Sequence, residues 1–140
     1  MSTHARIGME QEGGKVKSIY CHFDGYPSHV GRILNESFKD PDKVKALVEL
    51  GDISYLEGEI EPTGPHSFSS PQKGVTVAYH RDRGEDLNLD YHGSVSSFFA
   101  SRNEPFIYMF TQEGEWLVKR SRSGNDPMTF ENYERLIGLQ

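Results

Sequence analysis

The first quarter of the chain alternates apolar and polar side chains in two stretches. Residues 4–10 show this alternation, and residues 16–22 are rich in β-branched and aromatic side chains. Between them, residues 12–14 read Glu-Gly-Gly, and glycine adopts the positive φ angles of tight turns at little steric cost. The pattern predicts a β-hairpin over residues 4–22.

Two helices are predicted next. Ser28 would be the N-cap of the first, because its hydroxyl can accept a hydrogen bond from a free backbone N–H of the first turn. The second is predicted over residues 41–50, with Asp40 as N-cap, Pro41 at its first position and Gly51 after its last turn. Apolar positions of the first helix recur at helical spacing: Val30, Ile33, Leu34 and Phe38.

The second half of the chain alternates loop and strand patterns. Residues 57–74 are rich in Gly, Pro, Ser and Thr and predict a long loop, a feature that in compact domains tends to be functional or disordered. Residues 74–80 give the strongest strand pattern, and residues 81–86 a charged turn. Further along we expect a short helix capped by Ser94, a hairpin over residues 104–120 and a C-terminal helix beginning near Thr129.

The order of these elements predicts a single α+β domain over residues 1–140. We expect a mainly antiparallel sheet of about five strands, with three to four helices packed on one face. A chain of this length buries roughly 70% of its unfolded surface, which suffices for one hydrophobic core.

Composition restricts the environment and the partners. The single cysteine, Cys21, excludes a disulfide within the chain and suits a reducing cytoplasm. No apolar run approaches the ~20 residues of a membrane span, and the start lacks a signal-peptide core, so we expect a cytoplasmic protein that binds no membrane. The net charge of −6 disfavours nucleic acid as the main ligand, because phosphate binding requires a basic face.

The densest chemistry lies in the segment Tyr20-Cys-His-Phe-Asp-Gly-Tyr-Pro27, at the predicted junction of a strand and a helix. Such a junction favours a binding site, because the first N–H groups of a helix are free to bind an anion. The alternative interpretation is structural. Tyr20 or Phe23 would then lie in the core, Asp24 would form a turn with the following glycine, and Pro27 would begin the helix.

A second candidate segment follows the strongest strand pattern. Arg81 and Arg83 lie close to His80, and guanidinium groups bind phosphate or carboxylate through paired, charge-assisted hydrogen bonds. In the alternative interpretation this is a solvated loop whose arginines are neutralised by Asp82 and Asp86.

Both segments contain the pattern His-x-Asp, as His22/Asp24 and His80/Asp82. On a strand, such residues project from the same face, so the pairs could bind a divalent metal or supply an acid and a base. Neither a cysteine nor a third histidine lies at ligand spacing, and we predict no metal and no cofactor. The motifs Gly-x-Ser-x-Gly, His-Glu-x-x-His and the Gly-rich phosphate loop are also missing.

The chain resembles a group of small phage- and prophage-encoded proteins over roughly its first two thirds. The most specific element is Tyr-Cys-His-x-Asp-Gly-Tyr-Pro. The resemblance implies a phage accessory protein, and such proteins often act as counter-defence factors: some sequester nucleotide messengers of bacterial immunity, some cleave them, and others bind a defence protein. The residues that carry it are Thr3-His-Ala-Arg-Ile-Gly8, Ser18–Ser28, Val30-Gly31, Asp40–Asp52 and Val75–Gly84.

We therefore expect a counter-defence protein that binds and sequesters a small anionic, nucleotide-derived immune signal, as a homo-oligomer. One alternative is a phosphodiesterase that cleaves such a signal with His22 and His80 as base and acid. Another is an inhibitor whose acidic surface masks a defence complex. In the binding hypothesis Tyr20, Tyr26 and Tyr79 stack the base, His22, Asp24 and His80 give polar recognition, and Arg81, Arg83 and the helix start at Ser28 hold phosphate.

Overall fold

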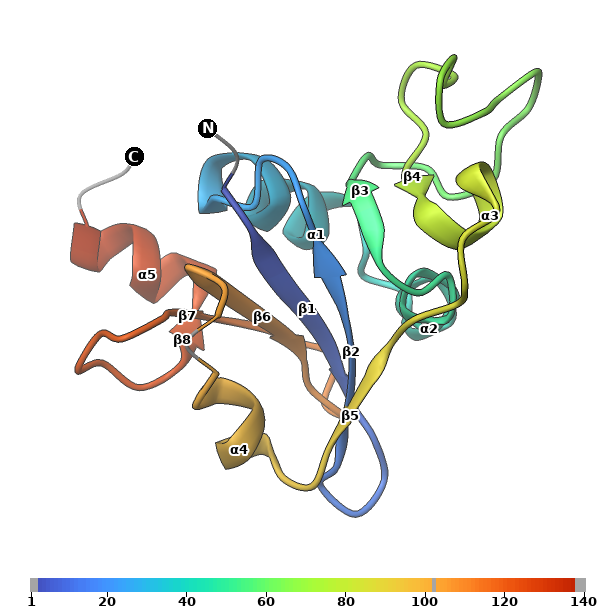
Figure 1. Ribbon diagram of the computed structural model, residues 1–140. Helices are drawn as coiled ribbons and strands as arrows, with labels where there is room; N and C mark the ends of the chain where they lie inside the picture. The colour runs from blue at the N-terminus through green and yellow to red at the C-terminus, as the bar shows by residue number, and fades with distance from the viewer. Residues whose placement is uncertain (1–2, 102, 138–140) are drawn as a thin grey trace.

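The computed structural model describes residues 3–101 and 103–137 (Figure 1). Strands of this described part form one sheet of eight in the order β4-β3-β2-β1-β6-β7-β8, and β5 also pairs with β2. The strands are β1 (Ala5–Glu10), β2 (Val16–Cys21), β3 (Ile53–Tyr55), β4 (Val77–Ala78), β5 (Asp90–His92), β6 (Phe106–Phe110), β7 (Trp116–Arg120) and β8 (Met128–Thr129). The α+β class is as predicted.

The helical elements connect the strands. Within the described residues they are η1, a π-helical turn (Pro27–Gly31), and five α-helices, α1 (Arg32–Ser37), α2 (Pro41–Glu49), α3 (Tyr79–Arg83), α4 (Val95–Phe99) and α5 (Phe130–Ile137). No helix among the residues described is long and apolar enough to span a bilayer.

Both predicted hairpins form. β1 pairs antiparallel with β2, and the turn between them uses Gly13 and Gly14, both at positive φ. β6 pairs antiparallel with β7 around Gly114, which also has a positive φ. Glycine is suited to these turns because it has no Cβ to clash in the left-handed region.

Five of the strand pairings in the described sheet are antiparallel, as predicted for most of it, and two are parallel, so the sheet is mixed. β1 pairs parallel with β6, and β2 pairs parallel with β3. The second arrangement follows from the connection, because η1, α1 and α2 carry the chain back across the sheet before β3 begins. Three strands that were not predicted, β3, β5 and β8, have only two or three residues each, too few to show an alternating pattern.

Helices cover both faces of the sheet, so the prediction of one covered face is wrong. The main core lies between one face and η1, α1, α2 and α5, and it contains Ile7, Ile19, Leu34, Leu47 and Phe130. A smaller core lies on the opposite face, where Phe98 and Phe99 of α4 pack with Val16, Ile107 and Met109.

Helix boundaries follow the predicted capping residues in two cases. The Asp40 side chain accepts a hydrogen bond from the Asp42 N–H (2.9 Å) at the start of α2, and Ser94 forms a capping box with Ser97 in α4. The first helix begins earlier than predicted, at Pro27, and Tyr26 occupies the N-cap position instead of Ser28. Proline favours this, since its fixed φ suits the first helical position.

The segment predicted as the strongest strand is different in the structure. Regular pairing in residues 74–80 is limited to Val77–Ala78, plus an isolated bridge at Val75. The first residues of the predicted turn at 81–86 belong instead to the helix α3. The C-cap of this helix is Gly84, with a φ of 77°. The apolar alternation still marks burial, because Val75, Val77 and Ala78 are all buried.

Candidate functional site

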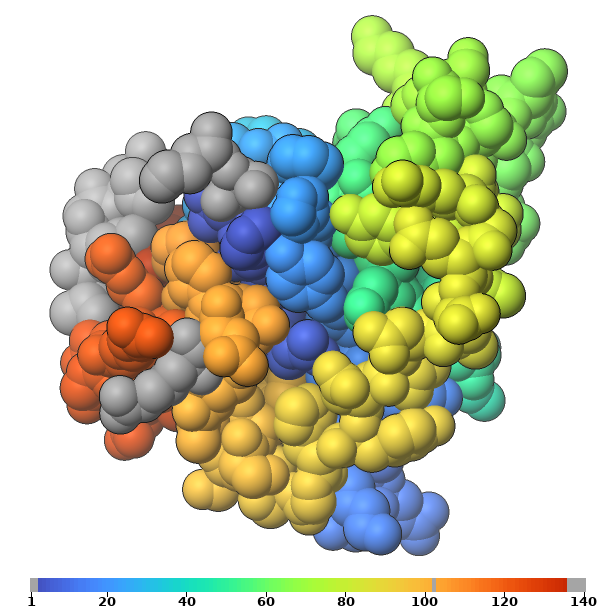
Figure 2. Space-filling view, viewed as in Figure 1, coloured from blue at the N-terminus to red at the C-terminus, as the bar shows by residue number. Residues whose placement is uncertain are grey.

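Alternation along β1 and β2 places polar and aromatic side chains on the face opposite the main core. Ile19 and Cys21 pack into the main core, so Tyr20 between them projects to the other side. Ala5 pairs with Cys21 in the hairpin, and the same register places His4 opposite His22. In Figure 2 the blue atoms of these first segments reach the surface between the orange and yellow parts of the chain.

Three side chains on this face form what we call the His–Tyr–His cluster: His4, Tyr20 and His22. The Tyr20 hydroxyl lies 2.7 Å from Nδ1 of His4 and 2.9 Å from Nδ1 of His22. His4 Nδ1 also lies 2.8 Å from the backbone oxygen of His22. The two imidazole rings have their centroids 4.7 Å apart. One phenol therefore connects two imidazoles that are close enough to contact the same ligand group.

The environment of the cluster favours the uncharged forms of His22 and Tyr20. Partial burial, and next the proximity of His4, lower the pKa of His22 below its usual value. Burial, followed by the charge that Tyr79 would carry, raises the pKa of Tyr20. At neutral pH we therefore expect a neutral His22 imidazole and a protonated Tyr20 phenol.

Further aromatic rings extend this surface on both sides. The Phe23 ring meets His22 edge-on at 4.5 Å between centroids and is 44% exposed. On the other side, the Tyr79 ring lies 5.5 Å from that of Phe68, and the Arg83 guanidinium lies 4.8 Å above Phe68. Asp52 links this second group to the cluster, because its backbone oxygen accepts from the Tyr79 N–H (3.2 Å) and its carboxylate accepts from the Tyr20 N–H (2.9 Å).

The rest of the Tyr20–Pro27 segment holds the cluster in place. Asp24 has a positive φ of 56°, which turns the chain so that the Gly25 N–H donates to the Thr3 oxygen (2.8 Å). The buried Tyr108 hydroxyl donates to the Gly25 oxygen (2.7 Å). Cys21 is fully buried, and burial raises the pKa of its thiol to about 12, which makes it a poor nucleophile.

Other residues predicted for the site lie at the margin of this surface. The Tyr26 hydroxyl donates to Asp24 (3.3 Å), and both side chains are exposed. Ser28 lies in the first turn of η1, after the N-cap residue Tyr26. These three residues are neighbours of the cluster through the backbone but take no part in its hydrogen bonds.

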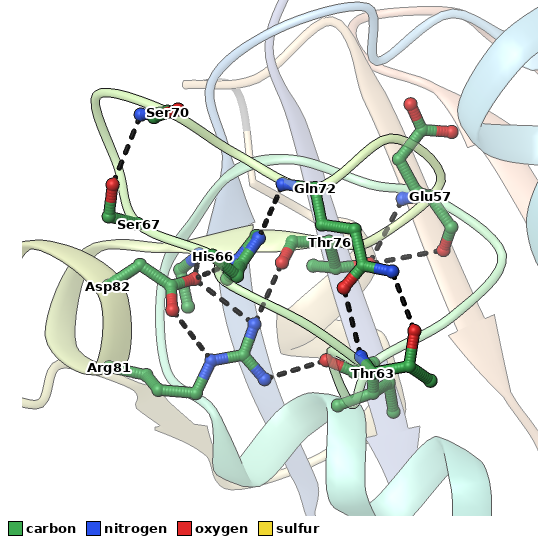
Figure 3. Close-up of polar contacts among 11 residues, drawn as sticks. Glu57, Thr63, His66, Ser67, Ser70, Gln72, Thr76, Arg81 and Asp82 are labelled. Atoms are coloured by element: carbon green, nitrogen blue, oxygen red, sulfur yellow. Dashed lines mark hydrogen bonds and ion pairs between the residues drawn. The ribbon is translucent and has the colours of Figure 1, made fainter.

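Arg81 belongs to an internal network that fastens the long loop to α3 (Figure 3). Its guanidinium donates to the Ile60 oxygen (2.7 Å), to the Thr76 oxygen (2.8 Å) and to Asp82 through Nε (2.9 Å). Asp82 also accepts from the Ala78 N–H (2.8 Å). Asp82 neutralises Arg81, as in the alternative interpretation of this segment, but the segment is a helix joined to the loop through two backbone carbonyls and not a solvated loop.

His66 completes the network from the middle of the loop. Its Nδ1 accepts from the Gln72 N–H (2.9 Å), and its Nε2 lies 3.1 Å from Asp82 Oδ2. That contact is close but poorly directed, so we treat it as electrostatic rather than as a hydrogen bond. The His66 and Asp82 side chains are only 2% and 4% exposed, which places both groups in the interior.

The remaining charged residues of the second segment are also engaged. His80 Nδ1 contacts the Glu85 oxygen (2.7 Å), and Arg83 pairs with the Glu85 carboxylate (3.2 Å). Of the predicted residues, the structure thus brings Tyr20 and His22 into contact, and Asp52 links the backbone of Tyr79 to that of Tyr20. His4 was not predicted, although the hairpin register would have placed it opposite His22.

A second polar centre lies beside the cluster on the same face. The Arg6 guanidinium donates to Asp90 (2.7 Å) and to Ser18 Oγ (3.0 Å), and pairs with Glu104. Ser18 Oγ also lies 2.8 Å from His92 Nε2, but Ser18 is fully buried. This centre ties β1 and β2 to β5, and the burial of Ser18 closes it to a substrate.

Several hollows among the described residues lie away from the His–Tyr–His cluster. One, of about 170 Å³, is lined by β7, β8 and α5 and contains Lys119, Arg120 and Asp126. Charges of both signs lie there, which gives it no clear ligand preference. We therefore place the candidate site on the open aromatic face.

Comparison with known proteins adds no assignment. No family model, curated protein or solved structure matches the chain. Among the residues described, no group of three or more His, Cys, Asp or Glu side chains is arranged to hold a metal ion.

Proposed function

We propose that this protein binds a small ligand that carries a planar ring and an anionic group, and that the ligand contacts the His–Tyr–His cluster and Phe23. The observation that carries the proposal is the state of the two outer imidazole nitrogens. Nε2 of His4 and Nε2 of His22 have no hydrogen-bond partner among the described residues, and both residues are partly exposed.

The proposal that the ligand carries a planar ring rests on the exposed aromatic side chains of this surface. Phe23 is 44% exposed and Tyr26 is 38% exposed, although large apolar rings are usually more buried. A nucleobase stacked on such a ring gains about 1–3 kcal/mol, and stacking tolerates different bases.

The proposal that the ligand carries an anionic group rests on the two imidazoles of the cluster. A phosphate near both rings would accept a hydrogen bond from an imidazole Nε2–H group. The phosphate contact that the sequence predicts for Arg81 is not part of this proposal, because the Arg81 guanidinium already donates to Asp82 and to the Ile60 and Thr76 oxygens.

The ligand class we propose is a nucleotide-derived immune signal, held by a phage counter-defence protein that acts as a homo-oligomer. This rests on the resemblance to phage and prophage proteins together with the aromatic and imidazole chemistry of the surface. The net charge of −6 supports a small ligand over a polynucleotide.

The test is uptake and release of candidate nucleotides. Purified protein is mixed with mononucleotides, dinucleotides and cyclic dinucleotides, separated from free ligand, denatured and analysed by chromatography. Intact release supports sequestration, an altered product indicates an enzyme, and the absence of uptake across the panel contradicts the proposal and favours a protein partner.

Variants then locate the site. Phe23→Ala and His22→Ala should each weaken the binding of a captured nucleotide about tenfold or more in calorimetry. Tyr91→Ala is the matched control, because Tyr91 is 73% exposed but lies outside the proposed surface. Equal loss of affinity in all three variants would contradict this location of the site.

A further inference from the structure

We propose that His4, Tyr20 and His22 form a proton relay that enables the site to cleave a ribonucleotide phosphodiester. This inference rests on the proposed function, because the same surface must first bind the nucleotide. It adds an activity to that function and assigns a role to His4, which the sequence alone did not indicate.

The hydrogen bonds assign the positions of the protons in the resting cluster. A backbone carbonyl only accepts, so His4 Nδ1, at 2.8 Å from the His22 oxygen, carries a hydrogen. The Tyr20 oxygen, at 2.7 Å from the same nitrogen, can then only accept from it. The Tyr20 hydroxyl donates its own proton to His22 Nδ1 at 2.9 Å. The tautomers are thus assigned from the network.

This arrangement gives the two outer nitrogens opposite roles. With Nδ1 protonated, neutral His4 has a lone pair on Nε2 and can accept a proton. With Nδ1 accepting from Tyr20, His22 carries its hydrogen on Nε2 and can donate it. Both residues are partly exposed and their ring centroids lie 4.7 Å apart, so a base and an acid can face the same ligand.

The nucleophile must come from the ligand or from solvent. Cys21 and Ser18 are fully buried, and Ser54 is 3% exposed, so none of these neighbouring groups can reach a bound phosphate. A ribose 2′-hydroxyl next to a phosphodiester is already positioned for attack, and intramolecular reactions of this kind need no separately bound nucleophile. We therefore specify a phosphodiester with a vicinal hydroxyl as the substrate class.

The reaction balances without a further reactant. His4 Nε2 takes the proton from O2′ as the new P–O2′ bond forms. The Nδ1 proton of His4 passes to the Tyr20 oxygen, and the Tyr20 proton passes to His22 Nδ1. His22 Nε2 gives its proton to O5′ as the P–O5′ bond breaks. The products are a 2′,3′-cyclic phosphate and a free 5′-hydroxyl, and both imidazoles end neutral with exchanged tautomers, which exchange with solvent restores.

The experiment uses uridylyl-(3′,5′)-adenosine and 3′,5′-cyclic di-AMP as probes, with their 2′-deoxy analogues as non-cleavable ligands. Binding is measured by calorimetry and cleavage by chromatography. We expect cleavage of at least one ribose probe that binds, and none of its deoxy analogue. His4→Gln and His22→Gln should lower turnover about 10²–10⁴-fold, the usual share of general acid–base catalysis. His29→Gln is the control, because His29 contacts the Leu56 oxygen outside the cluster.

Tyr20→Phe separates the relay from a merely structural role, because it keeps the ring and removes the shared hydroxyl. The relay starts from two neutral imidazoles, so the wild-type rate should stay level as the pH rises from 7 to 9. Without the Tyr20 hydroxyl, no proton can pass to Nδ1 of His22 during the reaction. His22, the general acid, must therefore be protonated on both nitrogens before the reaction begins. The variant should therefore lose kcat as the pH rises through that range, while KM changes little.

The outcomes separate the two proposals. A ribose probe that binds but stays intact overturns the relay and leaves the proposed function standing. Cleavage that persists in His4→Gln and His22→Gln also overturns the relay. If neither probe nor analogue binds, the relay fails for this substrate class, and the wider nucleotide panel then decides the proposed function.

Discussion

Neighbouring residues of β2 have different roles because their side chains alternate across the sheet. Cys21 packs in the main core, whereas Tyr20 and His22 project to the opposite face and join His4. Gly25, after the strand, has a purely spatial role. A Cβ built on it would lie 2.6 Å from the Ala5 Cβ and 2.8 Å from the backbone carbon of His4. The segment that supplies two cluster residues therefore also positions the third.

The close approach at Gly25 gives a prediction at the residue scale. Gly25→Ala should destabilise the protein by about 1–3 kcal/mol, because the new methyl group meets backbone atoms that cannot move independently. Urea unfolding followed by circular dichroism measures the effect. Gly64→Ala is the matched control, since no atom lies within 4 Å of its added Cβ. Equal stability of the two variants would contradict the close packing.

The sequence predicts individual residues well where the partner is local. Asp40 and Ser94 are helix caps as predicted, because a cap bonds to N–H groups two or three residues away. His4 could have been found from the hairpin register. Arg81 could not be interpreted in this way, because its partners include the Ile60 carbonyl, 21 positions away in a loop whose path has no sequence pattern.

Short elements share the outer edge of β2. β3 pairs with it only at Cys21, and β5 only over Val16–Ser18. Asp52 fills the gap: its carboxylate accepts from the Tyr20 N–H (2.9 Å) and from the Asn88 side chain (2.7 Å). This contact fixes the backbone of Tyr20, and it shows how two unpredicted short strands contribute to the geometry of the cluster.

The network around Arg81 gives a prediction at the scale of the loop and α3. Arg81→Ala should remove the Arg81 hydrogen bonds to the Ile60 and Thr76 carbonyls and to Asp82, and should cost about 1–3 kcal/mol in local stability. Hydrogen exchange should become faster in residues 57–76 while β6 stays protected. Arg135→Ala is the control, because its pair with Glu131 is exposed and contributes little. Unchanged exchange in the loop would refute this role of Arg81.

The same network predicts a pH dependence. Burial alone would raise the pKa of Asp82, but hydrogen bonds from Arg81 and the Ala78 N–H, together with the close contact of His66, outweigh it and lower the pKa below its usual value. The stabilisation is therefore present above the unfolded pKa and is lost as the pH falls through the lower, folded value. Urea unfolding between pH 2 and 6 should show this acid loss in the wild type and a flatter profile in Asp82→Asn. Parallel profiles would contradict it.

At the scale of the whole molecule, local order was predicted and long-range pairing was not. The hairpins and the α2 boundaries follow from patterns within about 20 residues. The parallel pairing of β1 with β6 joins segments about 100 residues apart, and the coverage of both faces depends on it, because α4 packs against Ile107 and Met109 of β6. Nothing in the alternation of either strand specifies its neighbour in the sheet.

The position of Cys21 makes it a probe of the whole fold. Its thiol is fully buried in the main core, with a pKa of about 12. At pH 8 the thiolate fraction should be roughly 10³-fold below that of an exposed cysteine, so a disulfide reagent should label the native protein very slowly and the urea-unfolded protein at once. Where labelling requires global unfolding, a nucleotide that binds the native state should slow it further, by about 100-fold at 100 times its Kd.

Phe23→Ala should weaken that protection at the same nucleotide concentration, since Phe23 belongs to the proposed surface and Cys21 packs on the opposite side of the sheet. Tyr91→Ala should retain it. Rapid labelling of the native wild-type protein, at the rate seen in urea, would show that the core opens around Cys21 without global unfolding. That result would remove the rigid strand on which Tyr20 and His22 depend for their positions.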